Sequence, residues 1–146
     1  MRKVACGVAL LLLVSPGCSS KPSLNVAGKW KTEWQGDNFG TGILTLRPDG
    51  TFEEDIRSGI KSRNFFMHSV GKGKYRLESS KLILVNEGTD VEFLNADGSV
   101  KRKSSQDKTT THSFPVIRHS SGELVLGEDP GVPTGQSETI YRRIGQ

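Results

Sequence analysis

The sequence predicts an all-β protein built as one antiparallel, up-and-down barrel of about eight to ten short strands. Three observations support this fold class. Short segments in which apolar and polar residues alternate recur along the chain, with the two-residue period of a half-buried strand. Turn formers separate them, since the 146 residues include 17 glycines and 6 prolines. No segment shows the apolar period of a helix, and closure into a barrel removes exposed sheet edges.

The domain is expected to open with a strand at residues 28–34. Trp30, Thr32 and Trp34 alternate there with charged residues, which is typical of a half-buried strand. A loop at residues 35–40 should follow.

The most regular segment, residues 42–56, predicts two strands joined by a tight turn. Leu44 and Leu46 share one face of the first strand, and Phe52 and Ile56 provide the matching face of the second. The residues between the two strands favour a tight turn through their own backbone preferences.

In that turn, Pro48 sets φ near the value that a type I turn needs. Gly50 then supplies the positive φ with which the chain re-enters the ladder. The segment therefore predicts a hairpin, and the rest of the chain repeats its design.

After the hairpin, short apolar segments alternate with turn formers. Asp97-Gly98 is the strongest turn signal, and Pro115 indicates an edge strand or a strand end because proline cannot donate to the ladder. Strands are expected at residues 63–70, 75–78, 81–85, 91–94, 99–103, 109–114, 116–118, 123–126 and 138–144. Turns are expected at residues 71–74, 79–80, 95–98 and 120–122, and a loop at residues 128–136.

The N-terminus has the form of a secretory signal. Met1–Lys3 carries positive charge, and residues 4–14 form an uncharged apolar run that is too short for a spanning helix. The small residue before Cys18 resembles a bacterial lipoprotein signal, although Ser15 stands where that family usually has leucine. The resemblance implies that Cys18 is diacylated and becomes the first mature residue. By likeness to enterobacterial lipoproteins, Ser19 favours the outer membrane over the inner one.

The cysteine count agrees with lipidation. Removal of the leader would also remove Cys6, so the exported chain would keep only Cys18 and could form no internal disulfide. We therefore expect a signal peptide at residues 1–17, a lipidated tether at residues 18–27 and a barrel domain at residues 28–146. Several acyl chains, palmitate among them, would hold the protein to the membrane firmly.

The charge balance gives no reason to expect a nucleic-acid partner. The formal net charge is +4, but Arg2 and Lys3 belong to the leader, and the remainder has 18 basic and 16 acidic residues. Lys101–Lys103 together with Lys108 form the densest basic cluster. Two interpretations stay open: contact with acidic lipid headgroups, or protection of a strand edge.

Several short motifs, taken in order, resemble those of small bacterial lipocalin-like domains. They are Gly28-Lys29-Trp30, the hairpin at residues 44–52, Gly73-Lys74-Tyr75-Arg76-Leu77, Leu124-Val125-Leu126 and Tyr141-Arg142-Arg143. The resemblance implies a lipocalin-like barrel with Trp30 at one end, and Arg142 or Arg143 stacked on its indole through a cation–π contact. We also expect the first strand to pair with the last, because a barrel otherwise keeps two open edges.

No catalytic residue, metal site or cofactor is expected. The three histidines are His68, His112 and His119, and a continuous strand would place the last two on opposite faces. The chain lacks the Gly-x-Ser-x-Gly elbow of a hydrolase. The carboxylates of Glu53, Glu54 and Asp55 follow a turn and are assigned to a solvated face. Glu128 and Asp129 are expected in a loop and could bind calcium, but the ligand pattern of an EF-hand does not surround them.

Two functions from different classes remain. The first is an envelope lipoprotein whose barrel binds a small hydrophobic molecule or lipid. The alternative is a protein-interaction or inhibitor module of the envelope with a filled barrel. With 7% aromatic residues, a small cavity is expected rather than a large one. Inward residues expected to line it are Trp34, Leu44, Leu46, Phe52, Leu84 and Phe93.

Overall fold

The computed structural model of the chain describes residues 24–131 and 137–145. The expected signal peptide, Cys18 and part of the loop at 128–136 lie outside these ranges. The described residues form nine strands and one short 3-10 helix, η1 (Lys61–Arg63). The strands are β1 (Gly28–Trp34), β2 (Asn38–Leu46), β3 (Thr51–Ile60), β4 (Phe65–Glu78), β5 (Lys81–Leu94), β6 (Val100–Gln106), β7 (Thr110–His119), β8 (Glu123–Gly127) and β9 (Glu138–Arg143).

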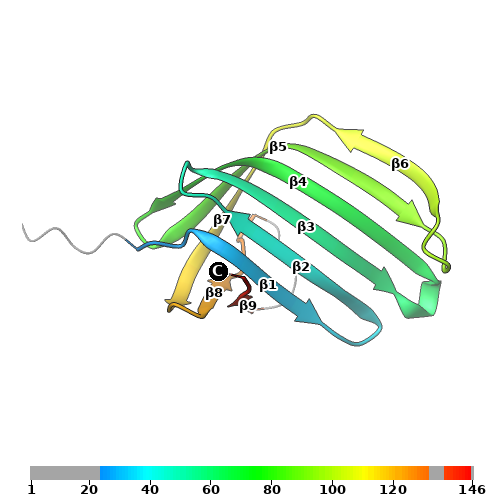
Figure 1. Cartoon of the computed structure of the whole chain (residues 1–146), viewed down its shortest axis with the longest axis horizontal. Helices are drawn as coiled ribbons and strands as arrows, with labels where there is room; N and C mark the ends of the chain where they lie inside the picture. The colour runs from blue at the N-terminus through cyan, green and yellow to red at the C-terminus, as the bar shows by residue number, and fades with distance from the viewer. Residues whose placement is uncertain (1–23, 132–136, 146) are drawn as a thin grey trace, which may run out of the picture.

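The strands form a closed antiparallel barrel. β1 to β5 pair in chain order, and β7, β8 and β9 complete the ring back to β1. This confirms the predicted all-β, up-and-down, lipocalin-like fold. β6 lies outside the ring of eight, because it pairs with the second half of β5 while β7 pairs with the first half. Figure 1 shows β1 to β5 as one curved sheet with β6 at its far edge.

Two register pairs join the first strand to the last. Trp30 lies opposite Arg143 and Lys31 opposite Arg142, in antiparallel register. The N–H of Ile144 also donates to the carbonyl oxygen of Lys29 at 2.9 Å. The predicted pairing of the first and last strands is therefore confirmed. Beyond these pairs β1 and β9 separate, so the barrel is closed at one end and splayed at the other.

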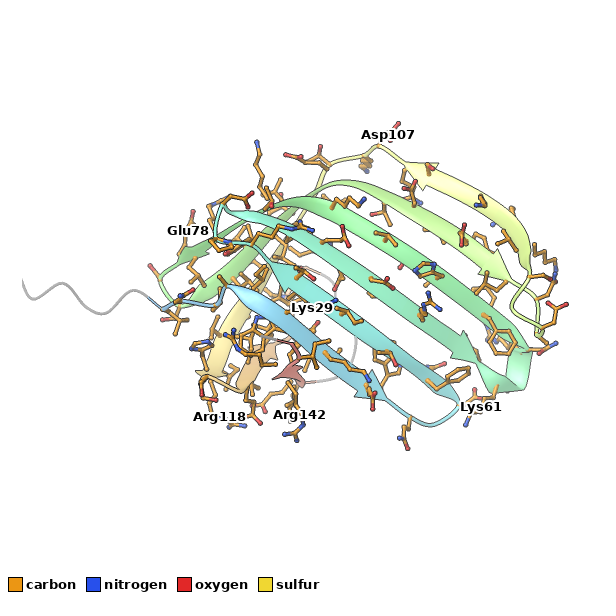
Figure 2. All side chains as sticks on the ribbon, viewed as in Figure 1. Lys29, Lys61, Glu78, Asp107, Arg118 and Arg142 are labelled. Carbon is orange, nitrogen blue, oxygen red and sulfur yellow. The ribbon has the colours of Figure 1, made fainter. Side chains whose placement is uncertain are left out.

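The closed end is filled by Trp30, whose side chain is fully buried. Its indole N–H donates to the carbonyl oxygen of Val26 at 2.9 Å, and the guanidinium of Arg143 lies 4.3 Å from the ring centroid. Arg143 is thus the arginine that makes the expected cation–π contact, whereas Arg142 is exposed and points away from the barrel (Figure 2). The buried hydrophobic cluster around the indole contains Val26, Leu44, Leu46, Phe52, Leu82, Leu84, Leu124 and Leu126.

His119 completes this end of the barrel. Its imidazole meets the Trp30 indole edge-on, with centroids 5.8 Å apart. Burial lowers the pKa of His119, and the neighbouring positive charge of Arg143 lowers it further. The imidazole is therefore neutral at pH 7, which lets it lie beside a guanidinium without charge repulsion.

The predicted hairpin turn is confirmed. The N–H of Gly50 donates to the carbonyl oxygen of Arg47 at 3.0 Å, and Gly50 has a φ of +83°. The carboxylate of Asp49 accepts the N–H of Thr51 at 2.9 Å, which locks the exit from the turn. The turn at residues 95–98 repeats the arrangement.

Two predicted boundaries are wrong because a β-bulge replaces a turn. Residues 71–74 lie inside β4, and residues 81–94 form one strand where two were expected. The pairing of β4 with β5 shifts between Lys72 and Gly73. A Cβ atom at Gly73 would collide with the carbonyl oxygen of Val85. Glycine is therefore needed there for close approach of two strands, and the chain does not turn.

Pro115 does not end a strand, since β7 continues through it to His119. It lies at the last position at which β7 pairs with β5, opposite Lys81. The next residue, Val116, pairs with Leu126 of β8. Proline thus stands where the strand changes partners, a place where the missing N–H is tolerated.

Candidate functional site

The candidate site is a polar layer inside the barrel, beyond the apolar core. On β3, Phe52, Glu54 and Ile56 face inward, because residues two apart share a face of a strand. Glu53 and Asp55 face outward and pair with basic side chains of the surface. The assignment of Glu54 to a solvated face is therefore wrong, and the correction follows from the same alternation that places Phe52 in the core.

A hollow of about 240 Å³, the interior cavity, lies beside Glu54 and is partly open to solvent. Its volume falls just below the range of about 300–1,000 Å³ that is usual for ligand pockets, so it suits a compact molecule. Apolar walls and converging polar groups alternate around it. The lining residues are Phe52, Glu54, Leu84, Asn86, His112, Phe114, Gly127, Glu128, Asp129 and Thr139.

A histidine–aspartate pair fixes one side of this cavity. The Nδ1–H of His112, on β7, donates to Oδ2 of Asp129 at 3.0 Å, and the Asp129 side chain is almost fully buried. Burial acts to raise the pKa of Asp129. Hydrogen bonds from the N–H of Gly131, from His112 and from the N–H of Ser113 outweigh burial, so the pKa is lowered. Asp129 is thus an ionised group that orients the imidazole.

Glu54 has a different environment. Its side chain is half-buried inside the barrel, and burial raises its pKa, with partial opposition from the nearby His112. No hydrogen bond from another described residue reaches the carboxyl. Burial also raises the pKa of Tyr141, on β9, and the charge of Glu54 raises it further. Glu54 is therefore an interior carboxyl that borders the hollow and has no hydrogen-bond partner among the described residues.

A groove forms where β1 and β9 separate. It measures about 600 Å³ and is lined by Trp34 and Thr32 from β1 and by Ile140 and Tyr141 from β9. Glu54 and Thr139 line both the groove and the interior cavity. Glu54 thus stands at the junction of the two hollows, and the splayed seam of the barrel is a lateral entrance to its interior.

Another hollow, of about 610 Å³, lies at the splayed end of β2 and β3. Trp34, Phe39 and Met67 line it together with Arg57 and Lys61. It is larger than the interior cavity but more open to solvent, so a ligand there would keep most of its water shell. The less open interior cavity with its converging polar groups is the better candidate.

The histidines lie differently from the sequence prediction. The pairing of β7 with β8 shifts between Val116 and Arg118, and this bulge returns His119 to the inner face. His112 and His119 both face inward, at different levels of the barrel. His68 lies on the outer face, 3.1 Å from Asp55. Within the described ranges, no group of three or more His, Cys, Asp or Glu side chains is arranged to hold a metal ion.

The residues expected to line a cavity lie in four different places. Leu44 and Leu46 are fully buried in the packed core, whereas Phe52 and Leu84 line the interior cavity. Trp34 lines the groove. Phe93, on β5, lies against the neighbouring strand β6.

Phe93 packs beneath the basic cluster of β6. The guanidinium of Arg102 lies 4.4 Å from its ring centroid. Lys103, on the opposite face of β6, forms an ion pair with Glu92 at 2.7 Å. The three basic residues at 101–103 therefore belong to an exposed strand whose outer edge has no partner strand among the described residues.

Comparison of the sequence with models of protein families gives no match, and no curated protein is significantly similar to it. Among the residues that the structure describes, no helix has the length and apolar character needed to cross a membrane.

Proposed function

We propose that the protein is a lipid-anchored lipoprotein of the bacterial cell envelope whose barrel binds a small, mainly apolar molecule. The observation that carries the proposal is the interior cavity. Its combination of apolar walls with converging polar groups is a feature that distinguishes ligand pockets from packing gaps. The resemblance of the sequence motifs to small bacterial lipocalin-like domains supports the same function.

The position of the first described residues suits a membrane tether. Val26 is buried beside Trp30 at the closed end, and the described chain enters the barrel there (Figure 1). β1 then runs toward the splayed end. A chain anchored through Cys18 would therefore present its closed end to the membrane and its splayed end to the aqueous compartment, from which a ligand would enter.

The alternative is a protein-interaction or inhibitor module. The unpaired outer edge of β6 favours it, because an exposed strand edge can accept a strand from a partner. Its basic side chains also discourage pairing with a further copy of itself. The interior cavity supports the ligand-binding function more directly, since a module that acts only through its edge has no need of a hollow interior.

Native mass spectrometry of the protein extracted from its source envelope tests the proposal. We expect the main species to exceed the acylated polypeptide by the mass of one small molecule, and collisional activation should release that molecule. A co-purifying polypeptide without a small-molecule increment would support the interaction module instead. Acylated protein without any increment, even under the gentlest extraction, would count against a resident ligand.

Replacing the lipidation site tests the anchor. We expect Cys18→Ala to abolish incorporation of labelled palmitate and to shift the protein from the membrane fraction to precursor or soluble protein. The physical reason is that acyl chains supply the membrane affinity, at about 0.8 kcal/mol per buried methylene. Cys6→Ala, within the leader, is the matched control and should keep the label. The anchor is wrong if wild-type protein takes up no label and Cys18→Ala still sediments with membranes.

A further inference from the structure

The interior hollows are acidic in a chain that is basic overall. The full sequence carries a net charge of +4, yet no lysine or arginine is among the described residues that line the cavity and the groove. The titratable side chains that line them, other than tyrosine, are Glu33, Glu54, His112, Glu128, Asp129 and Glu138. The charge of the side chains that line the two hollows is therefore opposite in sign to the net charge of the whole chain.

Glu54 is the carboxyl best placed to bind a ligand, because at least three of the other four carboxylates, Glu128 among them, already have a partner. Asp129 is bonded to His112, and Glu33 at the rim is paired with Lys31. Glu54 lies deeper than Glu33, borders both hollows and receives no hydrogen bond from a described residue. A carboxyl that is partly withdrawn from water and has no protein partner is less well stabilised than one in solution, and a ligand that supplies the partner gains part of that free energy.

We propose, on the basis of the ligand-binding function above, that the ligand is a compact organic cation whose protonated amine bonds the carboxylate of Glu54. The apolar body of such a molecule would lie against Phe52 and Phe114 in the cavity. The indole of Trp34 lines the groove, where its ring face is suited to attract a positive charge on the way in.

The same geometry disfavours a ligand with an anionic head, such as a fatty acid, although His112 also lines the cavity. A carboxylate needs arginine, lysine or several N–H donors in a buried site. Here it would instead meet Glu54 and the ionised Asp129. The raised pKa of Glu54 agrees with this assignment, because burial is its main cause, His112 opposes it only in part, and an ammonium group would supply a closer counter-charge.

Titration with three probes of one shape tests the charge preference. Benzylammonium, benzyl alcohol and benzoate differ mainly in the charge of the group attached to one ring. With the full-length protein at pH 7.5 in isothermal calorimetry, we expect benzylammonium to bind about tenfold or more tightly than benzyl alcohol, since a charge-assisted hydrogen bond is worth about one order of magnitude. Benzoate should bind most weakly of the three.

Substitution at Glu54 assigns the preference to that carboxyl. In Glu54→Gln the advantage of benzylammonium over benzyl alcohol should disappear, while continued binding of benzyl alcohol shows that the pocket is intact. Glu53→Gln removes a carboxylate from the outer face of the same strand and should leave all three affinities as in the wild type. Equal affinity for benzylammonium in wild type and Glu54→Gln would overturn the assignment.

Failure of this inference is distinguishable from failure of the binding function. If benzyl alcohol or benzoate binds wild-type protein as tightly as benzylammonium, the barrel binds small molecules and the cation inference is wrong. If none of the probes binds and native mass spectrometry shows no bound molecule, the binding function and the inference fail together.

Discussion

Deletion of the chain from Ser137 onward is expected to unfold the protein rather than to trim a loose end. The deleted part contains β9, which pairs with β8 at five register positions and closes the ring on β1. Its loss would leave two open edges in the sheet, and an open edge exposes a row of unpaired N–H and C=O groups. The barrel would lose its closure as well as one strand.

The deletion would also uncover the centre of the core. Arg143 covers the Trp30 indole, and Tyr141 lies opposite Leu124 on the inner face. Fully exposing one large apolar side chain costs about 1.5–3 kcal/mol, whereas a whole domain is stable by only about 5–15 kcal/mol. Exposure of Trp30, Leu124 and Leu126 together therefore approaches the entire stability of the domain.

Far-ultraviolet circular dichroism and the thermal midpoint measure the outcome. A chain that ends at Ile144 is the matched control, since it keeps all of β9 and should melt like the full-length protein. The deletion from Ser137 should instead lose its strand signal and its cooperative transition. If it keeps the native signal and midpoint, closure through β9 is unnecessary and an open sandwich describes the molecule better.

The features that sequence predicted correctly have local or topological causes. The turn around Gly50 depends on a proline and a glycine at fixed offsets, so four neighbouring residues determine its geometry. The pairing of the first strand with the last follows from the need of a barrel to close. The burial of Trp30 follows from that pairing, because it places the indole beneath Arg143.

The features that sequence missed depend on single-residue register shifts or on contacts between distant segments. The bulge before Arg118 moves His119 to the opposite face of the strand. One extra residue in a strand cannot be recognised from the alternation of apolar and polar residues. The bond between His112 and Asp129 joins side chains seventeen positions apart. Glu54 is different, because the alternation of the sequence does predict its position. Its neighbours two positions away are apolar and face inward, so Glu54 faces inward too. The prediction failed only because carboxylates were assumed to face water.

Trp30→Ala is expected to destabilise the protein far more than Trp34→Ala. Removal of a fully buried tryptophan side chain costs about 3–5 kcal/mol, because transfer free energy is lost and a cavity remains. The substitution would also take away the ring under Arg143, whose Nε is buried without a hydrogen-bond partner among the described residues. Loss of that contact leaves a poorly solvated charge, which adds to the cost.

Trp34 is the matched control because it lies on the same strand and the same face, four residues further along. Its side chain is only half-buried and lines the groove instead of the core, so Trp34→Ala should cost less than about 2 kcal/mol. Urea unfolding followed by circular dichroism gives both free energies of unfolding. Equal losses for the two variants would mean that the closed end does not hold the barrel together, since the two sites differ in burial and in the contact with Arg143 but not in the side chain removed.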